Sequence, residues 1–318
     1  MRNNKLILTF LILISLLLSA CTTADPSAPP SQAEASAETP LKIELPTTDP
    51  AGNAIVVPGK IEKIVSLAPS ITEILIEMGY ADKLVAVDLQ SKNIENLPEG
   101  LEYFELMSPD AERLAAMKPD IIYASTISIG NGSDVLSPLK ELGISVVYIP
   151  SSDSIDGIYK DIEFIAATLQ NQIEGDRIVA EMRERIEEIR SLSETITDKK
   201  TVYFEISAAP YMYSFGKGVF LDEMIEIIGA ENLLADQEGW ISVSEELILS
   251  KNPQVILTNV NYIENSVEEI KTRAGWDSVE AVKNGEIYYI DNMSSSLPNH
   301  NIVKALEEML RAVYPELN

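Results

Sequence analysis

Short apolar runs alternate with segments of helical spacing over much of the chain. The runs consist mainly of Ile, Val, Leu and Ala, which is typical of buried strands in a parallel sheet. In the first half they are 63–68, 84–87, 120–124 and 145–149. Segment 70–79 between them begins with Ser70-Ile-Thr-Glu73, the spacing of a helix capping box. Because parallel strands need crossover connections, usually helices, this alternation predicts a first α/β lobe over residues 41–152.

A segment without strand patterns follows, over residues 153–198. Its second helix, 174–196, carries an apolar stripe formed by Ile178, Met182, Ile186 and Ile189. At 1.5 Å per residue this helix is about 34 Å long, enough to cross between two lobes. We therefore predict a rigid spine helix. The alternation then resumes and predicts a second α/β lobe over residues 199–318, with strands 201–206, 255–258 and 287–290 and a closing helix 301–313.

One local pattern occurs twice, at an offset of 253 − 119 = 134 residues. Ser108 and Ser242 each precede a short run of helix formers, which ends at Pro119 in the first copy and at Pro253 in the second. Serine is a favoured N-cap and proline ends a helix, and an Ile/Val-rich run follows each proline. Each copy therefore predicts a capped helix, a break and a buried strand.

The repeat also places one carboxylate at a matched position in each lobe. Glu112 and Glu246 both lie seven residues before the proline. A carboxylate in a first helical turn stabilises the helix by about 0.3–1 kcal/mol, which is one interpretation of both residues. Two equivalent acidic side chains on two related lobes favour the other interpretation, a pair of docking points.

The first twenty residues have the pattern of a secretion signal. Arg2 and Lys5 precede the apolar run 6–18, and Leu18-Ser-Ala-Cys21 follows as a lipobox. The run is shorter than the ~20 apolar residues that a membrane-spanning helix needs. Cys21 is the only cysteine in the chain, so no internal disulfide can form, and we expect it to be lipidated. Residues 21–40 are rich in Ser, Thr, Ala and Pro and are expected to form a flexible tether.

The net charge of the chain limits the kinds of partner that it can bind. The chain has 24 cationic and 50 acidic residues, a net charge of −26. Removal of residues 1–20 would delete Arg2 and Lys5, which gives 24 − 2 − 50 = −28. Such a surface repels phosphates and excludes nucleic acid as a partner. It fits a partner that presents arginines.

Four segments resemble those of ABC-importer substrate-binding lipoproteins of the helical-backbone class, which carry cobalamin, ferric siderophores or haem. The segments are 63–75, 117–122, 229–233 and 281–288, and the resemblance extends from Ile43 to Pro315. It implies an α/β fold with two lobes of mostly parallel sheets, one long spanning helix and a ligand cleft between the lobes. In this family an acidic residue on each lobe engages arginine pockets of the permease, and the matching positions here are Glu112 and Glu246.

The resemblance also implies ligand-contacting residues. Tyr213 and Trp240, which we expect in loops, match aromatic positions of the cleft in corrinoid binders. Pro69, Met107, Ser108 and Ser125 lie where predicted strands end or predicted helices begin, which is where ligands bind in open α/β sheets. Leu106 and Ser125 stand where corrinoid binders often have aromatic residues, so the resemblance does not fix the identity of the ligand. The loops offer few cations for an anionic siderophore, Lys217 being one, which favours cobalamin or a related corrinoid.

His300, the only histidine, permits several interpretations. It can cap the last helix, face solvent, or be an axial ligand to the cobalt or haem iron of a bound macrocycle, in a haem carrier together with Met107. A single histidine excludes the sites of zinc and manganese carriers. No Gly-x-Ser-x-Gly elbow, phosphate loop or dinucleotide fingerprint is present. A surface hydrolase with paired carboxylates and a sensory protein that presents its ligand are the remoter classes.

We therefore expect a protein that is not an enzyme and has no cofactor or metal site of its own. It is expected outside the cytoplasm, anchored to the membrane by lipid on Cys21. It would capture a large metal-bearing small molecule, either a corrinoid such as cobalamin or, alternatively, a ferric siderophore or haem. The permease and ATPase subunits of an ABC importer would be its partners.

Overall fold

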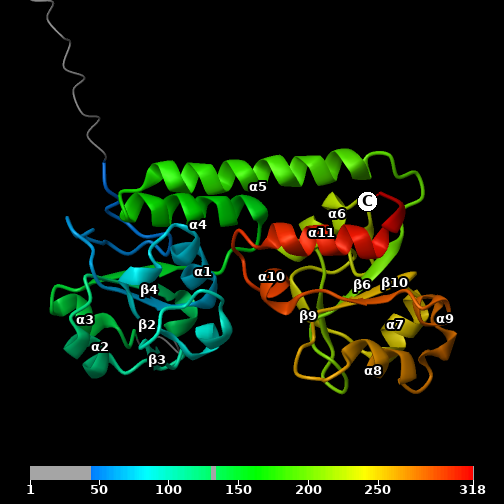
Figure 1. Ribbon diagram of the computed structural model, residues 1–318. Helices are drawn as coiled ribbons and strands as arrows, with labels where there is room; N and C mark the ends of the chain where they lie inside the picture. Colours follow the sequence, from blue (N-terminus) through cyan, green and yellow to red (C-terminus); the bar gives the residue numbers. More distant parts are fainter. Residues whose placement is uncertain (1–43, 130–133, 318) are drawn as a thin grey trace, which may run out of the picture. The chain divides into compact units, whose positions relative to one another are not determined.

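The computed structural model describes residues 44–129 and 134–317, which belong to one compact unit, Ile43–Asn318. Two parallel sheets lie side by side, and the long helix α5 runs over both of them (Figure 1). The predicted signal peptide, tether and lipidated Cys21 lie outside the described residues.

The first lobe is a five-stranded, fully parallel sheet in the order β3-β2-β1-β4-β5. Its chain order reverses at β1, which pairs with β2 on one side and with β4 on the other. The strands are β1 Ile64–Leu67, β2 Leu84–Asp88, β3 Glu102–Phe104, β4 Ile121–Ser125 and β5 Ser145–Ile149. The helices are α1 Pro69–Glu77, α2 Ala111–Met117 and α3 Ser137–Glu141.

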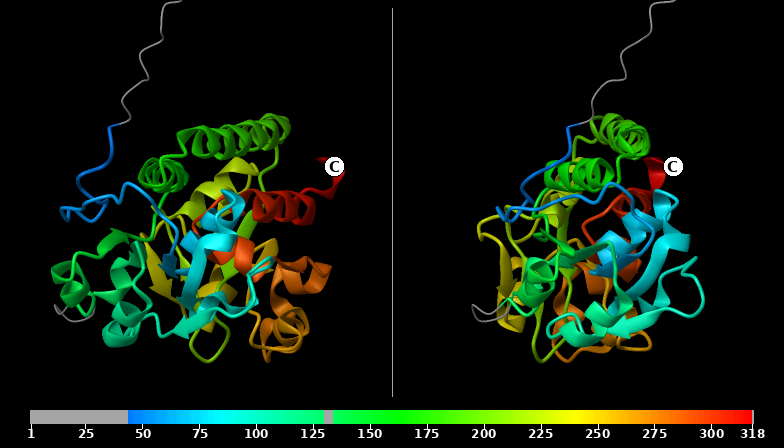
Figure 2. Two further views of the ribbon diagram at one scale, coloured as in Figure 1. Left: turned by 60° about the vertical axis from the view of Figure 1, so that its left-hand side comes forward. Right: turned by 90° about the vertical axis from the view of Figure 1, so that its left-hand side faces the viewer.

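Two packed helices connect the lobes, α4 (Ile155–Thr168) and α5 (Gln172–Ser193). The 22 residues of α5 correspond to about 33 Å, and Ile178, Met182, Ile186 and Ile189 are buried along one side, as the stripe predicts. Figure 2 shows both helices on the same side of the molecule in two further views. The predicted spine helix is confirmed, with its ends at 172 and 193 rather than 174 and 196.

The second lobe contains a four-stranded parallel sheet in the order β11-β10-β6-β8, and a separate antiparallel ribbon, β7-β9. The strands are β6 Thr201–Glu205, β7 Tyr213–Phe215, β8 Glu231–Asn232, β9 Trp240–Ser242, β10 Val255–Thr258 and β11 Ile287–Tyr289. The helices are α6 Phe220–Ile227, α7 Glu245–Lys251, α8 Ser266–Thr272, α9 Glu280–Asn284, α10 Asn292–Ser296 and α11 Ile302–Val313.

The two lobes repeat one structural unit at the predicted offset. Helices α2 and α7 have seven residues each and end at a residue with left-handed backbone, Lys118 (φ 51°) and Asn252 (φ 52°). After the proline, Asp120 accepts a hydrogen bond from the backbone N–H of Lys63, and the side chain of Gln254 accepts one from Thr201. Each of these bonds joins the start of a central strand to the strand that pairs with it.

Three sequence-based expectations about local structure are wrong. The N-caps of α2 and α7 are Asp110 and Ser244, not Ser108 and Ser242. Ser242 is the last residue of β9 and pairs with Tyr213, so it cannot begin the helix. The aromatic segments 213–215 and 240–242 form strands, not loops.

The third error is the capping box of α1. That helix has Ala68 as its N-cap, without a side-chain hydrogen bond. Glu73 accepts hydrogen bonds from the second lobe instead of from the start of its own helix.

The apolar core is continuous between the lobes on the side of α5. Alternate strand residues such as Ile121 and Tyr123 of β4 point into this shared core, together with α1, α4, α5, α6 and α11. The intervening residues, such as Ile122, point into a separate core under α2 and α3. A third core lies under α7, α8 and α9. This arrangement places α2 and α7 on the faces of the sheets away from α5 (Figure 1).

Candidate ligand cleft and docking face

A pocket of about 170 Å³ lies where β1, β4 and β5 end, at the point where the strand order reverses. This is where ligands bind in open α/β sheets. The first lobe contributes Pro69 and Ser125, two of the predicted ligand residues, and the second lobe contributes the segment Ser296–Pro298. The remaining lining residues are Ala68, Ser70, Ile71, Ile74, Gln90, Leu106, Ile127, Ile149, Pro150, Ser151, Asp161 and Ile165.

The lining of this pocket is mainly apolar, with hydroxyl and amide groups and one carboxyl group. None of the described residues that line it is a lysine, an arginine or a histidine. The carboxyl group belongs to Asp161 of α4, whose Oδ2 accepts a hydrogen bond of 2.6 Å from Ser152 Oγ. Burial raises the pKa of Asp161 to about 6. The described lining of the pocket therefore offers no positive charge to an anionic ligand.

The ribbon β7-β9 carries the two predicted aromatic residues. Phe215 pairs with Trp240 and Tyr213 with Ser242, so Tyr213 and Trp240 are diagonal neighbours on one face. Both side chains are 43% exposed. The inner edge of Trp240 packs against Phe215 and Phe220 at centroid distances of 5.8 and 6.2 Å. β9 lies on the side of the second lobe that faces the first (Figure 1). Neither residue lines the 170 Å³ pocket.

Two other predicted ligand residues also lie outside that pocket. Met107 is 58% exposed and Ser108 is exposed, both in the loop between β3 and α2. Their neighbour Leu106 does line the pocket. The structure thus brings Pro69 and Ser125 together, and leaves Met107, Ser108, Tyr213 and Trp240 on exposed surfaces.

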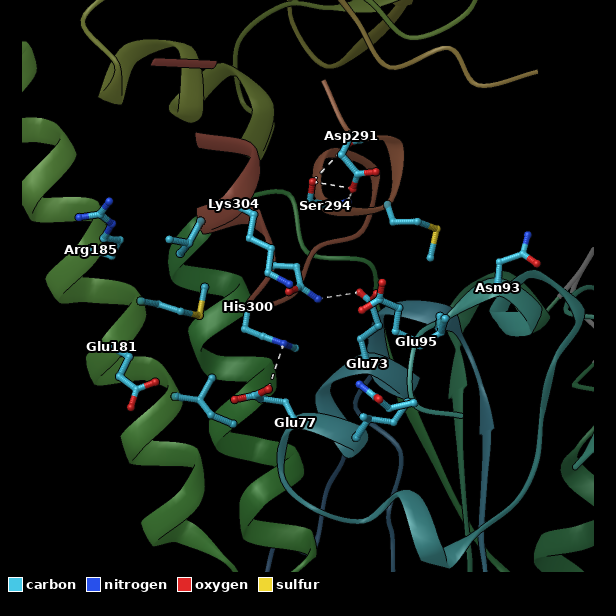
Figure 3. Close-up of a pocket in the computed structure, with 18 residues that line it drawn as sticks. Glu73, Glu77, Asn93, Glu95, Glu181, Arg185, Asp291, Ser294, His300 and Lys304 are labelled. Carbon is cyan, nitrogen blue, oxygen red and sulfur yellow. Dashed lines mark hydrogen bonds and ion pairs between the residues drawn. The ribbon is translucent and has the colours of Figure 1, made fainter. Parts of the chain in front are cut away.

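His300 lines a different, larger pocket of about 740 Å³ between α1, α5, α10 and the start of α11. Figure 3 shows this pocket and its many carboxylates, which include Glu73, Glu77, Glu95, Glu181 and Asp291. Arg185 and Lys304 are the cationic side chains among the described residues that line it.

The contacts of His300 correct the interpretation that it caps the last helix. Its Nε2 lies 3.8 Å from Glu77 Oε2, and its buried Nδ1 has no hydrogen-bond partner among the described residues. Desolvation lowers the pKa of His300 to about 4, so the imidazole is neutral at pH 7. Asn301, not His300, is the N-cap of α11. Met107 does not line this pocket, so the two proposed axial ligands of a haem share no pocket.

Glu112 and Glu246 occupy the same position in their helices. Each is exposed and is the second residue of a seven-residue helix, after the N-caps Asp110 and Ser244. Hydrogen bonds from its own backbone N–H and from the Ser244 side chain lower the pKa of Glu246. Both helices lie on the side of the sheets away from α5 (Figure 1).

The neighbouring Glu245 has a different environment. Its Oε2 accepts a hydrogen bond of 3.0 Å from Nε1 of Trp276, which is fully buried. The guanidinium of Arg273 stacks on Trp276 at 4.4 Å and pairs with the buried Glu205. This network fixes the first turn of α7 and leaves Glu246 directed to solvent.

Sequence analysis missed two groups of residues in this region. Asp161 lies in the middle of a helix, and no local pattern separates it from the other acidic residues of α4. The contact of Glu73 with Asn299 and Asn301 joins residues more than 220 positions apart. Its only sequence signal, the capping-box spacing, pointed to a different interaction.

The described part of the chain contains no helix that is both long and apolar enough to span a membrane. Within residues 44–129 and 134–317, no three His, Cys, Asp or Glu side chains are grouped as a metal site.

Comparisons with known proteins define the family. Residues 64–293 match the periplasmic binding protein family. The chain is 30% identical to the uncharacterized ABC transporter substrate-binding lipoprotein YvrC of Bacillus subtilis, over 95% of this chain and 96% of that protein. It is 29% identical to the vitamin B12-binding protein of Vibrio cholerae, over 79% of this chain and 89% of that protein.

A solved structure gives the same result. The crystal structure of a possible iron-binding (periplasmic solute-binding) protein from Staphylococcus epidermidis has a TM-score of 0.71 and 31% identity, over 80% of this chain and 99% of that chain. The chain belongs to the periplasmic binding protein family. It is a substrate-binding protein of the two-lobed α/β class and not an enzyme.

Proposed function

We propose that this protein is the lipid-anchored substrate-binding component of an ABC importer and that it carries cobalamin or a related corrinoid. In this proposal Cys21 holds the lipid outside the cytoplasm, and the permease and ATPase subunits receive the ligand. The names of the Bacillus and Vibrio relatives support both parts. Recovery of a Cys21→Ser variant from the membrane fraction would contradict the anchor.

The importer part rests on the equivalence of Glu112 and Glu246. The two carboxylates occupy the same helical position, both are exposed, and both lie on the side of the molecule away from α5, although 134 residues separate them. Exposed charges at the rim of an interface set register and increase the encounter rate more than they increase affinity. A basic site on each half of a permease would engage one carboxylate from each lobe.

A double substitution tests the docking role. The variant Glu112→Ala with Glu246→Ala should lower cobalamin uptake by cells at least tenfold, while its affinity for cyanocobalamin stays within twofold of wild type. The control combines Glu99→Ala and Asp277→Ala, which removes two exposed carboxylates from the same two lobes. Cells with the control variant should take up cobalamin at the wild-type rate. Loss of cyanocobalamin affinity in the first variant would place the glutamates in the cleft and contradict the docking role.

The ligand part rests on the composition of the cleft. The 170 Å³ pocket has Asp161 and no cationic side chain among its described residues, so ionised carboxylates of haem or of an anionic siderophore would meet a group of their own sign. The exposed rings of Tyr213 and Trp240 offer faces to a large flat molecule. A corrin ring with uncharged amide side chains matches both properties.

One observation favours a ferric ligand as the second candidate. Tyr211 and Tyr262 are 82% and 65% exposed on the second lobe, and phenol oxygens are good ligands for ferric iron. Titration of the purified protein with cyanocobalamin, haemin and the anionic siderophore complex ferric enterobactin, followed by absorbance, separates the candidates. We expect cyanocobalamin to bind at least tenfold more tightly than the other two. Tighter binding of haemin or ferric enterobactin would contradict the corrinoid assignment and leave the family unchanged.

A further inference from the structure

Three side chains join the two lobes beside the ligand cleft. Glu73 of α1 belongs to the first lobe, and its Oε2 accepts hydrogen bonds from Asn299 Nδ2 at 2.5 Å and from Asn301 Nδ2 at 3.2 Å. Both asparagines belong to the second lobe, immediately before α11. Figure 3 shows the Glu73 carboxylate directed across the gap between α1 and this segment.

The segment around Asn299 is tightly bonded to itself. Asn299 is fully buried, and its Oδ1 accepts a hydrogen bond of 2.8 Å from the backbone N–H of Asn301. Its backbone N–H donates to Leu297 O at 2.8 Å. These two bonds tie Leu297, Asn299 and Asn301 together. A carboxylate that holds Asn299 and Asn301 also holds Leu297.

The same two elements form opposite walls of the ligand pocket. Pro69, Ser70, Ile71 and Ile74 of α1 line it from the first lobe, and Ser296, Leu297 and Pro298 line it from the second. Glu73 lies on α1 between Ile71 and Ile74, so its bonds to Asn299 and Asn301 join the two walls immediately behind the pocket. The distance between the walls then depends on these bonds.

We infer that Glu73 is a positioning residue for ligand binding, because its carboxylate clamps segment 296–301 of the second lobe against α1 and thereby sets the width of the cleft. The inference rests on the proposed function for its role in binding. It does not depend on which ligand binds. A clamped cleft loses less conformational freedom when a ligand binds, so the clamp should increase affinity.

The test measures amide hydrogen exchange by mass spectrometry on the full-length protein without ligand. Glu73→Ala removes the acceptor, and we expect exchange in residues 296–304 to become at least tenfold faster, while α5 and β4 keep wild-type rates. Glu73→Gln retains an oxygen that can accept both bonds without the charge and should fall between wild type and Glu73→Ala. If the alanine variant does not fold, the glutamine variant alone should still show faster exchange in 296–304.

The matched control is Glu95→Ala, because Glu95 lines the same large pocket and is exposed. It should leave exchange in 296–304 unchanged. Wild-type exchange of that segment in both Glu73 variants, or acceleration spread equally over every element, would overturn the clamp.

Binding of cyanocobalamin as a probe is measured in parallel. We expect its dissociation constant to rise at least fivefold in Glu73→Ala and less in Glu73→Gln. Unchanged affinity in both variants would overturn the positioning role. If the wild-type protein does not bind cyanocobalamin, the corrinoid assignment is contradicted. The exchange measurement would then still test whether Glu73 holds segment 296–301.

Discussion

At the scale of single residues, chemically identical side chains differ in their burial and therefore in their contacts. Glu245 and Glu246 are adjacent, yet the first accepts a hydrogen bond from buried Trp276 and the second faces solvent. Trp276 is fully buried, whereas Trp240 is 43% exposed on the ribbon β7-β9. The sequence could not separate the glutamates by burial, because both lie in the first turn of one short helix.

Asp161 gives a prediction about pH at this scale. Its pKa is raised from 3.8 to about 6 in the folded protein, mainly by burial. Between these two values the folded state binds a proton that the unfolded state does not, so stability falls as pH rises through this window. Asp161→Asn removes the titration. Relative to wild type, the variant should therefore gain stability from about pH 4 to about pH 6.5, by at most about 3 kcal/mol.

Urea denaturation at a series of pH values measures this difference. Asp156→Asn is the control on the same helix, because the hydrogen bond from Lys160 lowers the pKa of Asp156. That control changes no titration inside the window and should give a constant offset from wild type. A constant offset for Asp161→Asn as well would show that Asp161 is already ionised in the folded protein at pH 4.

At the scale of elements, the internal repeat is the most predictable feature. Proline at 119 and 253 and the spacing of the glutamates predicted two equivalent helices, and α2 and α7 are equivalent in length, cap position and left-handed end. The predicted caps were two residues too early. In α2 the cap is Asp110, whose side chain accepts a hydrogen bond from the backbone N–H of Arg113, and Ser242 is held in β9 by its pairing with Tyr213. In both copies the residue two positions after the serine is the cap.

The contact between α4 and α5 depends on a glycine near the start of α5. A Cβ atom on Gly175 would lie 2.4 Å from the Cβ of Ala166, closer than two carbon atoms can approach. Gly175→Ala should therefore force the helices apart and lower the free energy of unfolding by about 1–3 kcal/mol, although alanine is the better helix former.

Chemical denaturation measures this effect, with Gly59→Ala as the control. Gly59 is exposed, and a Cβ there would meet nothing within 4 Å. The control should change the free energy of unfolding by less than about 0.5 kcal/mol. Equal stability of the two variants would mean that α4 and α5 can separate at no cost.

At the scale of the whole molecule, a shared core and a large negative charge set the behaviour. The core on the side of α5 is continuous through both lobes, whereas the cores under α2 and α7 are separate. The two exposed glutamates therefore sit on parts of the molecule that are tied together at their far side. A net charge of −26 adds a long-range electrostatic field around both glutamates.

This field predicts that docking depends on salt and ligand binding does not. The Debye length falls from about 14 Å to about 4 Å between 0.05 and 0.5 M salt. Over that range the association rate with permease in nanodiscs should fall at least tenfold, and less in the Glu112→Ala, Glu246→Ala variant. Affinity for cyanocobalamin should stay within twofold. Surface plasmon resonance measures the first quantity, and absorbance titration the second. A salt-independent association rate would contradict electrostatic docking.

Features that depend on neighbours along the chain could be predicted from the residues alone. Alternating apolar runs specified the α/β lobes, the stripe on α5 specified the spanning helix, and the repeat specified the two matched glutamates. These patterns are local, because the periods of helices and strands and the backbone limits of proline and glycine act over a few residues.

Which residues share a cavity or a bond could be learned only from the folded chain. It placed Pro69 and Ser125 in one pocket with Asp161, and His300 in another. It also joined Glu73 to Asn299 across 226 residues of sequence. Such contacts follow from burial and from the packing of distant elements. One chain carries many acidic residues, and only the fold decides which of them is desolvated or paired.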